Sequence, residues 1–390
     1  MNHWIITNRE IGTRTVGGKK VEFIADTRRE PMPTFRIATF KPYAPGTIPK
    51  KDDALLAKID SAVSLIPDEP VDGYADLEPD DNPTSVNASR RLLLSLYQTM
   101  TQAPEGKGDT LFFIHGFNYA WPDAVRHLQR LHELYVLPSE SPIDRIVYFT
   151  WPSWGQTGRY PSDQEIAWPS GLLLGRVFAK TVRFYADFFR PSKGKRPFCG
   201  RKIHLAAHSM GNQVLREFIR QVAPVRHLHV AIFGEVLMLN ADLEWHALEG
   251  GQPLFDLHQF CDRTHVYNHH HDDALHISEA TKNSEKRLGR HGPRSIAPGV
   301  LPPRTVVVDC SALGAPDDAT PDTDAFINAA RRVLGTSKVD LKERLGDHWG
   351  YLYRPEVIAD LYGVLKGHSS GALPRRTAKA PGLYALGSAE

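Results

Sequence analysis

The stretch that decides the fold is Ile203-His204-Leu205-Ala206-Ala207-His208-Ser209-Met210-Gly211-Asn212-Gln213-Val214-Leu215. An apolar run ends abruptly at a serine between small residues, and helix-favouring sequence follows, which predicts a strand, a tight turn and a helix. Small neighbours at Ala207 and Gly211 let the strand and helix approach closely around a strained serine. We expect the Ser209 hydroxyl at the positive end of the helix, where unpaired backbone N–H groups stabilise negative charge.

This turn fits the nucleophile-elbow pattern Gly-x-Ser-x-Gly, except that Ala207 stands at the first position. A Ser-x-Gly turn after a strand is also a common helix N-cap. The rest of the chain must therefore decide between a nucleophile and a cap.

Length and composition indicate an ordinary globular protein. The chain has 390 residues, 41% of them hydrophobic and 24% charged, which suits one large domain with additions. The net charge of +2 gives no sign of a nucleic-acid-binding surface. Three cysteines, Cys199, Cys261 and Cys310, form a sparse set without a Cys-x-x-Cys pair, so neither a disulfide framework nor a zinc site is expected.

No targeting or membrane segment is predicted. The N-terminus lacks the basic start and apolar core of a signal peptide, and no apolar run approaches membrane-spanning length. A cytoplasmic, reducing location is therefore the default expectation. Nothing in the sequence indicates the oligomeric state.

The first hundred residues read as a β-rich extension with two helices. Short runs rich in Ile, Thr, Val and Phe are separated by Gly-Gly and Pro, which predicts antiparallel strands or hairpins. These runs lie at residues 4–7, 21–25 and 35–40. Helical spacing follows at 53–66 and 89–101, with an acidic loop at 67–83 between them. We expect residues 1–100 to pack on a catalytic core.

From residue 109 onward, short β-rich runs alternate with longer helical runs, the signature of a parallel sheet with helices on both faces. The expected strands are residues 110–114, 146–150, 203–207, 236–240, 264–268 and 305–309. The expected helices are residues 121–135, 171–189, 213–222, 248–260, 323–334 and 355–365. We predict an α/β catalytic domain over residues 101–368, with a mostly parallel central sheet. The tail at 369–390, rich in Gly, Ala, Pro, Arg and Lys, is expected to be loosely held.

The first of these strands is followed by His115-Gly116-Phe117-Asn118. A His-Gly turn at the carboxyl end of a strand offers a free backbone N–H beside a neighbouring elbow, so Phe117 and Met210 are candidate oxyanion-hole donors. Alternatively, His115 caps a strand and Gly116 makes a turn. The elbow downstream, in the correct order, favours the oxyanion hole.

A serine nucleophile needs a histidine base, and the base needs a carboxylate that holds its tautomer. In folds that carry a nucleophile elbow, the chain order is Ser, acid, His. Asp272 and Asp273 lie just past the strand expected at 264–268, whereas Asp242 follows the preceding strand. The acid usually follows the second strand after the elbow, so Asp272 is preferred, and Asp242 and Asp273 are alternatives.

His348 is the candidate base, because Gly346-Asp347-His348-Trp349-Gly350 lies after the last expected strand and before the closing helix. The run His269-His270-His271 suggests a metal site. However, adjacent residues of an extended segment point to opposite sides, so three consecutive histidines cannot bind one ion without distortion. We expect no metal and no cofactor.

Several separate motifs occur in order along the chain. They are Phe149-Thr150-Trp151-Pro152-Ser153, then Tyr160 and Asp163, then Ala207-His208-Ser209-Met210-Gly211-Asn212, then Asp272-Asp273-Ala274-Leu275 and Arg287-Leu288-Gly289-Arg290. With the His-Gly-Phe turn upstream, they make the chain resemble the α/β-hydrolase superfamily, and within it a bacterial branch long described as of unknown function. The resemblance covers roughly residues 109–365, with a weaker match at Thr7-Asn8-Arg9.

The resemblance implies a role for each matched residue. Ser209 is the implied nucleophile, Asp272 the acid, His348 the base, Phe117 and Met210 the oxyanion donors, and Tyr160 and Asp163 part of a loop over the site. The chain departs from its relatives in the three histidines before the acid and in a long segment at 312–342. These departures affect the expected substrate contacts more than the chemistry.

These residues predict a serine hydrolase that cleaves small-molecule esters through an acyl-enzyme. An acyltransferase or amidase with the same residues, or a catalytically idle binding module, are the alternatives. The substrate-pocket candidates are His115, Asn118, Trp151, Tyr160 and His208. The aromatic residues Trp151, Trp154, Tyr160 and Trp168 form either a pocket wall or lid, or part of the core.

Overall fold

The structure, a computed structural model, describes residues 2–25, 30–67, 88–153, 160–188, 200–279, 283–313 and 347–387. Its central element is an 11-stranded sheet. The strands of this sheet are β1 (His3–Thr7), β4 (Arg36–Phe40), β5 (Val63–Leu65), β6 (Asp109–Ile114), β7 (Ile143–Thr150), β8 (Ile203–His208), β9 (Phe233–Leu239), β10 (Cys261–Asn268), β11 (Thr305–Asp309), β12 (Arg376–Ala380) and β13 (Leu383–Leu386).

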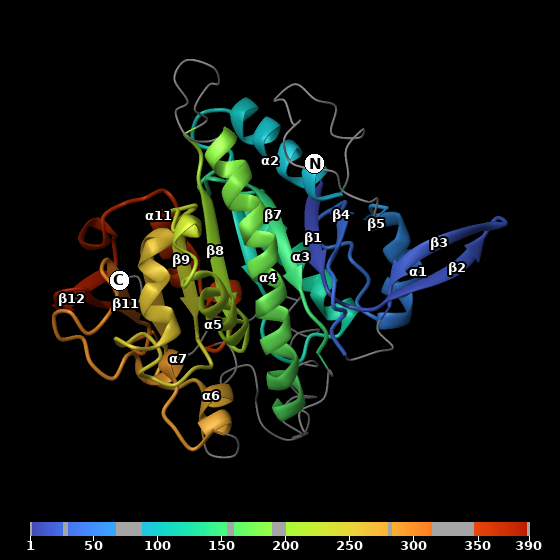
Figure 1. The fold of residues 1–390 in the computed structure, drawn as a ribbon. Coiled ribbons are helices and arrows are strands. Elements are labelled where there is room, and N and C mark those ends of the chain that lie inside the picture. Colours follow the sequence, from blue (N-terminus) through green and yellow to red (C-terminus); the bar gives the residue numbers. More distant parts are fainter. Residues whose placement is uncertain are drawn as a thin grey trace.

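The strand order is β12-β13-β11-β10-β9-β8-β6-β7-β1-β4-β5 (Figure 1). Neighbouring strands are parallel from β13 through to β1, whereas the pairs at the two edges are antiparallel. The predicted α/β fold with a mostly parallel central sheet is confirmed. Because parallel strands end at the same edge of a sheet, the loops after β6, β8, β9 and β10 gather there.

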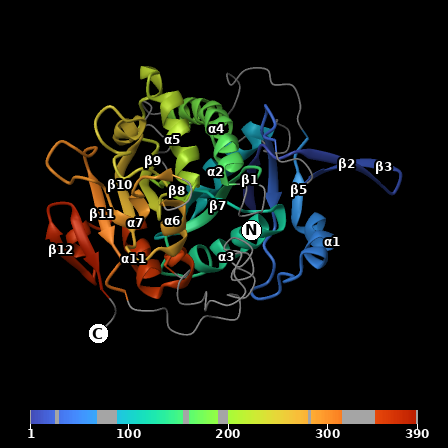
Figure 2. The same ribbon diagram turned by 90° about the horizontal axis from the view of Figure 1, so that it is seen from below.

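Helices cover both faces of the sheet (Figure 2). One face packs against α2 (Ala88–Gln102), α4 (Tyr160–Phe188) and α5 (Gly211–Val222). The other face packs against α1 (Asp52–Ala62), α3 (Trp121–Tyr135), α10 (Gly350–Tyr353) and α11 (Pro355–Leu365). The domain therefore has three layers, with the sheet in the middle.

Strand β7 shows how one sheet serves two cores. Val147 and Phe149 belong to the core on the α2 and α4 side, while Ile146 and Tyr148 belong to the core on the α3 side. Successive side chains of a strand point to opposite faces, so a strand that is apolar throughout is buried on both sides. This explains why the strands from residue 109 onward read as continuous apolar runs.

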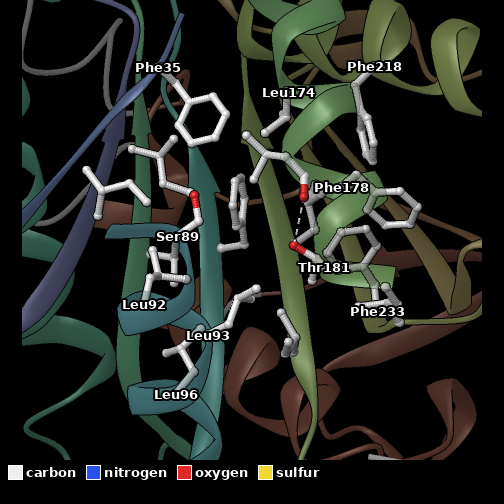
Figure 3. Close-up of a pocket in the computed structure, with 18 residues that line it drawn as sticks. Phe35, Ser89, Leu92, Leu93, Leu96, Leu174, Phe178, Thr181, Phe218 and Phe233 are labelled. Carbon is white, nitrogen blue, oxygen red and sulfur yellow. Dashed lines mark hydrogen bonds between the residues drawn. The ribbon is translucent and has the colours of Figure 1, made fainter. Parts of the chain in front are cut away.

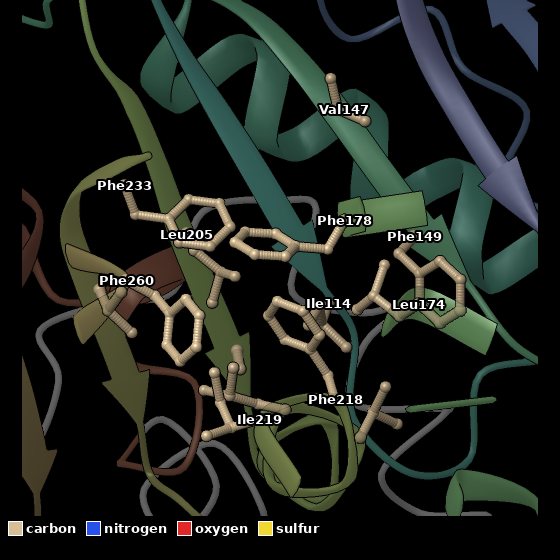
Figure 4. Close-up of a cluster of buried hydrophobic side chains, with 14 of the residues drawn as sticks. Ile114, Val147, Phe149, Leu174, Phe178, Leu205, Phe218, Ile219, Phe233 and Phe260 are labelled. Carbon is tan, nitrogen blue, oxygen red and sulfur yellow. The ribbon is translucent and has the colours of Figure 1, made fainter. Parts of the chain in front are cut away.

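Aromatic side chains fill the core on the α4 and α5 side (Figure 4). The Phe178 ring centroid lies 5.0 Å from that of Phe218 and 5.5 Å from that of Phe260. The backbones of α4 and α5 come close at Gly171, where a Cβ atom would lie only 2.6 Å from the Val214 carbonyl oxygen. Glycine at this crossing allows the helix that begins beside the candidate site to pack tightly on the helix that follows Ser209.

The N-terminal extension adds strands to the central sheet. β1 pairs in parallel with β7 and antiparallel with β4. A further antiparallel pair, β2 (Ile11–Val16) and β3 (Lys19–Ile24), forms a separate two-stranded sheet that projects from the body, at the right of Figure 1. The helix expected at 53–66 ends at Ala62, because β5 follows directly and pairs with β4.

The prediction of a loosely held C-terminal tail is wrong for residues 376–386. β13 pairs in parallel with β11 and antiparallel with β12. Arg376 fixes this hairpin, because its Nε and Nη2 atoms each donate to the Asp360 carboxylate of α11 at 2.7 Å. Leu386 is fully buried.

Of two further predicted helices, one is a different element and the other is untested. The segment predicted as a helix at 248–260 contains instead the 3₁₀ helix η4 (Pro253–Gln259). The helix expected at 323–334 lies outside the described residues. Within the described ranges, no helix has the length and apolar character needed to cross a membrane.

An apolar cavity of about 60 Å³ lies between α2, α4 and the sheet (Figure 3). Its walls include Leu92 and Leu96 of α2 and Leu174 of α4. They also include Ile203 and Phe233, the first residues of β8 and β9. The cavity therefore lies toward the amino ends of the strands, away from the edge where Ser209 follows β8.

Candidate active site

Ser209 forms a strained turn between β8 and α5. Its φ angle is 51°, a conformation that costs a residue other than glycine ~1–3 kcal/mol. Two backbone hydrogen bonds hold the turn: the Ser209 N–H donates to the Leu239 carbonyl at 3.0 Å, and the Asp242 N–H donates to the Ser209 carbonyl at 3.1 Å. The end of β9 thus fixes the serine in the conformation expected of an elbow.

The small residues around Ser209 admit the turn that follows β6. A Cβ atom on Gly211 would lie 2.6 Å from the His115 carbonyl oxygen, and one on Gly116 would lie 3.0 Å from the Ser209 Cβ. Glycine at 211 is therefore required, as the sequence indicated, but its closest neighbour is the backbone of the His-Gly turn. The elbow and the turn that carries Phe117 are in direct contact.

Asp272 and His348 lie side by side although 76 positions separate them. His348 Nδ1 is 2.7 Å from Asp272 Oδ2, and the Asp272 side chain is fully buried. Asp272 is the N-cap of α6 (Asp273–Ser278), where its Oδ1 accepts from the Leu275 N–H at 2.9 Å. The Asn240 amide donates to Oδ2 at 2.8 Å. Three donors thus orient this carboxylate, with His348 as one of them.

The loop around His348 is held by its backbone. His208 Nε2 lies 2.9 Å from the His348 carbonyl oxygen, and because a carbonyl only accepts, His208 carries its proton on Nε2. The Asn240 amide donates to the Asp347 carbonyl at 3.0 Å, and the Asp347 carboxylate forms a buried ion pair with Arg354. Burial, with His348 nearby, holds the pKa of His208 well below its usual range, so His208 acts as a neutral donor.

His348 lies against the residue that precedes Ser209. The His348 ring centroid is 4.7 Å from that of His208, the residue before Ser209. Ser209 is 6% exposed and His348 4% exposed. Among the described residues, the Ser209 hydroxyl and the N–H groups of Phe117 and Met210 have no hydrogen-bond partner. All three groups belong to the elbow or to the turn after β6, which are in contact at Gly116 and Gly211.

The alternative acid Asp242 has other partners. It accepts hydrogen bonds from the Tyr160 hydroxyl at 2.5 Å and from the Ser278 hydroxyl at 2.9 Å, and Arg287 Nε lies 3.3 Å away. These contacts join the start of α4 to the end of α6. The second alternative, Asp273, is the first residue of α6 and is partly exposed.

Several of the substrate-pocket candidates lie in the interior, where they support the site and do not line it. His115, His208 and Trp151 are each at most 1% exposed. The Trp151 indole stacks on the His115 ring with centroids 5.3 Å apart, and its Nε1–H donates to the His115 carbonyl at 3.1 Å. Asn118, 6% exposed with a φ of 65°, completes the turn.

Tyr160 and Asp163 do not form the loop over the site that was expected. Both lie in the first turn of α4 and are buried. The Ser153 hydroxyl donates to Asp163 at 2.5 Å and accepts from the Asn118 N–H at 2.8 Å. The Trp-Pro-Ser and Tyr-x-x-Asp motifs thus brace the turn after β6. Of the remaining aromatic candidates, Trp154 lies outside the described residues and Trp168 is 51% exposed.

The three histidines before the acid differ in burial. His269 is buried, with Nε2 3.4 Å from Asp347, whereas His270 and His271 are exposed. Among the described residues, no group of three or more His, Cys, Asp or Glu side chains is arranged to hold a metal ion.

Sequence reasoning missed the role of Asn240. Asn240 bridges Asp272 and the backbone of Asp347. A polar residue directly after a buried strand was the available signal, but its partners lie 32 and 107 positions away. Contacts of such long range cannot be read from local pattern.

The sheet order, the helices on both faces and the strained serine after β8 define the class of α/β hydrolases. Residues 95–308, more than half of the chain, match the family described as alpha/beta hydrolase of unknown function (DUF900), and the chain belongs to this family. The match includes Ser209 and Asp272 and ends before His348. No curated protein and no solved structure matches the chain.

Proposed function

We propose that this hydrolase cleaves carboxylic esters of small molecules with Ser209 as nucleophile, His348 as general base and Asp272 as the orienting acid. The observation that carries the proposal is the 2.7 Å contact between His348 Nδ1 and Asp272 Oδ2, in a loop held beside the elbow serine. The chain order Ser, Asp, His is the order of this fold class.

Asp272 keeps the proton of His348 on Nδ1, which leaves Nε2 free to accept the proton of Ser209. The Ser209 oxygen attacks the ester carbonyl, and the negative charge that develops is stabilised by the N–H groups of Phe117 and Met210. The tetrahedral intermediate collapses when His348 protonates the departing alcohol. His348 then removes a proton from water, which attacks the acyl-enzyme and releases the carboxylic acid.

Hydrolysis of p-nitrophenyl esters, from acetyl to lauroyl, tests this proposal. We expect turnover by the wild type and, for Ser209→Ala or His348→Ala, a loss on the order of 10³-fold or more in kcat. Equal rates for wild type and Ser209→Ala would overturn the proposal. Preferential cleavage of matched amides, or transfer to an added alcohol in preference to water, would replace ester hydrolysis by amidase or acyltransferase activity.

A further inference from the structure

A buried arginine on the N-terminal extension reaches the candidate site. Arg9 follows β1, lies outside the family match and is 1% exposed. Its Nε donates to the Thr150 hydroxyl at 2.9 Å, and its Nη2 donates to the Tyr119 carbonyl at 2.6 Å. Burying a guanidinium costs several kcal/mol before its partners compensate. Since β1 already pairs with strands on both sides, attaching this strand to the sheet does not by itself account for Arg9.

A relay of hydrogen bonds leads from Arg9 to the turn after β6. The Thr150 Oγ1 lies 3.0 Å from His115 Nε2, and His115 Nδ1 lies 2.8 Å from the Gly116 carbonyl oxygen. Arginine only donates, so the Thr150 hydroxyl accepts from Arg9 and directs its own proton to His115. The Trp151 N–H also donates to His115 Nε2, at 3.2 Å.

The direction of hydrogen-bond donation along this relay is fixed at both ends. Two donors point at His115 Nε2, and the Gly116 carbonyl can only accept. His115 is therefore the neutral tautomer with its proton on Nδ1. Burial, and next the charge of Arg9, hold the pKa of His115 well below its usual range, which agrees with a neutral ring.

The Gly116 carbonyl belongs to the same peptide unit as the Phe117 N–H. In a planar trans peptide the C=O and N–H bonds point in opposite directions, and the described backbone contains no cis peptide bond. A carbonyl held by His115 therefore fixes the direction of the Phe117 N–H. This peptide lies against the elbow, since a Cβ atom on Gly116 would be 3.0 Å from the Ser209 Cβ.

We propose that Arg9 is a positioning residue which, through Thr150 and His115, orients the Phe117 N–H toward the oxyanion. The inference rests on the proposed function, in which this N–H is an oxyanion donor. Arg9 holds the turn from a second side through the Tyr119 carbonyl. Hydrogen bonding to the carbonyl of a peptide also strengthens its N–H as a donor. The N-terminal extension thereby contributes to transition-state stabilisation.

Thr150→Val tests the relay, because valine keeps the shape of threonine and removes the hydroxyl. Loss of a whole oxyanion donor costs about 10²–10³-fold in kcat, so a misdirected one should cost on the order of 10-fold or more, with KM changed less than about 2-fold. Binding of a trifluoromethyl ketone, which forms a tetrahedral adduct with serine, should weaken by the same factor as kcat/KM. Thr150→Ser should restore most of the loss, and Arg9→Gln should reproduce it.

Thr110→Val is the matched control, because Thr110 is fully buried on the neighbouring strand β6 and its hydroxyl has no partner among the described atoms. Its kcat should stay within about 2-fold of wild type. Equal kcat for Thr150→Val and Thr110→Val, both folded by thermal melting, would overturn the relay.

A second readout does not depend on activity. In protein labelled with ¹⁵N-histidine, the His115 signal, assigned by its loss in His115→Gln, should show the proton on Nδ1. An Nε2-protonated His115 would overturn the relay even in an active enzyme. An Nδ1-protonated His115 in a wild type that neither cleaves esters nor reacts with serine probes would support the relay geometry and overturn the proposed function.

Discussion

The strain at Ser209 is balanced in part by the Asn212 side chain, which binds the backbone on both sides of the turn. The Asn212 amide donates to the Ala207 carbonyl at 2.9 Å and to the Ser209 carbonyl at 3.1 Å. These bonds tie the first turn of α5 back to the end of β8. A left-handed serine of this kind persists only where its surroundings over-determine it, and here strand, helix and the end of β9 all do so.

The two aspartates near the elbow should respond differently to the same substitution. Asp272→Asn keeps a hydrogen bond to His348 but no longer favours the tautomer that leaves Nε2 free, so kcat should fall on the order of 10³–10⁴-fold. The free energy of unfolding, measured in urea, should change by much less than the loss of kcat expressed as a free energy. Steady-state ester hydrolysis and urea titration of the same preparation check both expectations.

Asp242→Asn should act mainly on stability. Its carboxylate contacts Tyr160, Ser278 and Arg287 in the interior, and breaking a buried charge pair costs about 3–5 kcal/mol. The kcat per folded molecule should remain within about 10-fold of wild type. A larger loss of kcat in Asp242→Asn than in Asp272→Asn would show that the acid has been assigned to the wrong loop.

At the scale of elements, the site depends on close contact between the elbow and the turn after β6. Gly211→Ala places a Cβ 2.6 Å from the His115 carbonyl oxygen, and that neighbour is backbone. The turn must move, so we expect a loss of activity of about 10²-fold or more and a destabilisation of about 1–3 kcal/mol. Kinetics and thermal melting measure the two effects.

Gly250→Ala is the matched control, because a Cβ there meets nothing within 4 Å. It should leave both activity and stability near those of wild type. Full activity in Gly211→Ala would mean that the elbow and the turn are not in the contact that positions Phe117.

The elements that could be predicted from sequence are those whose pattern is local. Helix α3 begins and ends where its spacing indicated, because apolar residues repeat on one face and a proline stands at its start. β5 was missed because helical spacing continues through Val63–Leu65, and only pairing with β4 makes this segment a strand. The hairpin of β12 and β13 was missed because it depends on pairing with β11, far away in the sequence, and on an ion pair with Asp360 of α11.

The candidate site shows the same difference between residues with a local signal and residues with long-range contacts. Ser209, Asp272 and His348 occur in a recognisable order with recognisable neighbours, so they could be predicted from the sequence. Their supports could not, since Arg9 acts on a turn 110 positions away through its bond to the Tyr119 carbonyl. Supporting contacts follow from the packing of the sheet, which no local pattern encodes.

At the scale of the whole molecule, buried neutral histidines make stability dependent on pH. Burial lowers the pKa of His127 to about 3 from 6.5, and it lowers the pKa of His3, His115 and His208 well below the usual range. At pH values between the native and the unfolded pKa of each histidine, the unfolded chain binds a proton that the native protein does not. The free energy of unfolding therefore rises with pH. On acidification below about pH 6.5, each such histidine should remove ~1.4 kcal/mol of unfolding free energy per pH unit.

His127→Gln should therefore flatten the pH dependence. The slope of unfolding free energy between about pH 6 and pH 4.5 should decrease by ~1.4 kcal/mol per pH unit relative to wild type, as measured by urea unfolding across that range. His227→Gln is the control, because His227 is exposed. A slope in His127→Gln equal to that of wild type would contradict a neutral, buried His127.

The central claim is that Ser209 is a nucleophile activated by His348. The most direct measurement is reaction with a fluorophosphonate followed by peptide mapping by mass spectrometry. We predict one phosphonyl group per chain, on Ser209, absent in Ser209→Ala and formed at least about 100-fold more slowly in His348→Ala. A wild type that gains no adduct, or gains it on another residue at a rate that Ser209→Ala shares, would contradict the account.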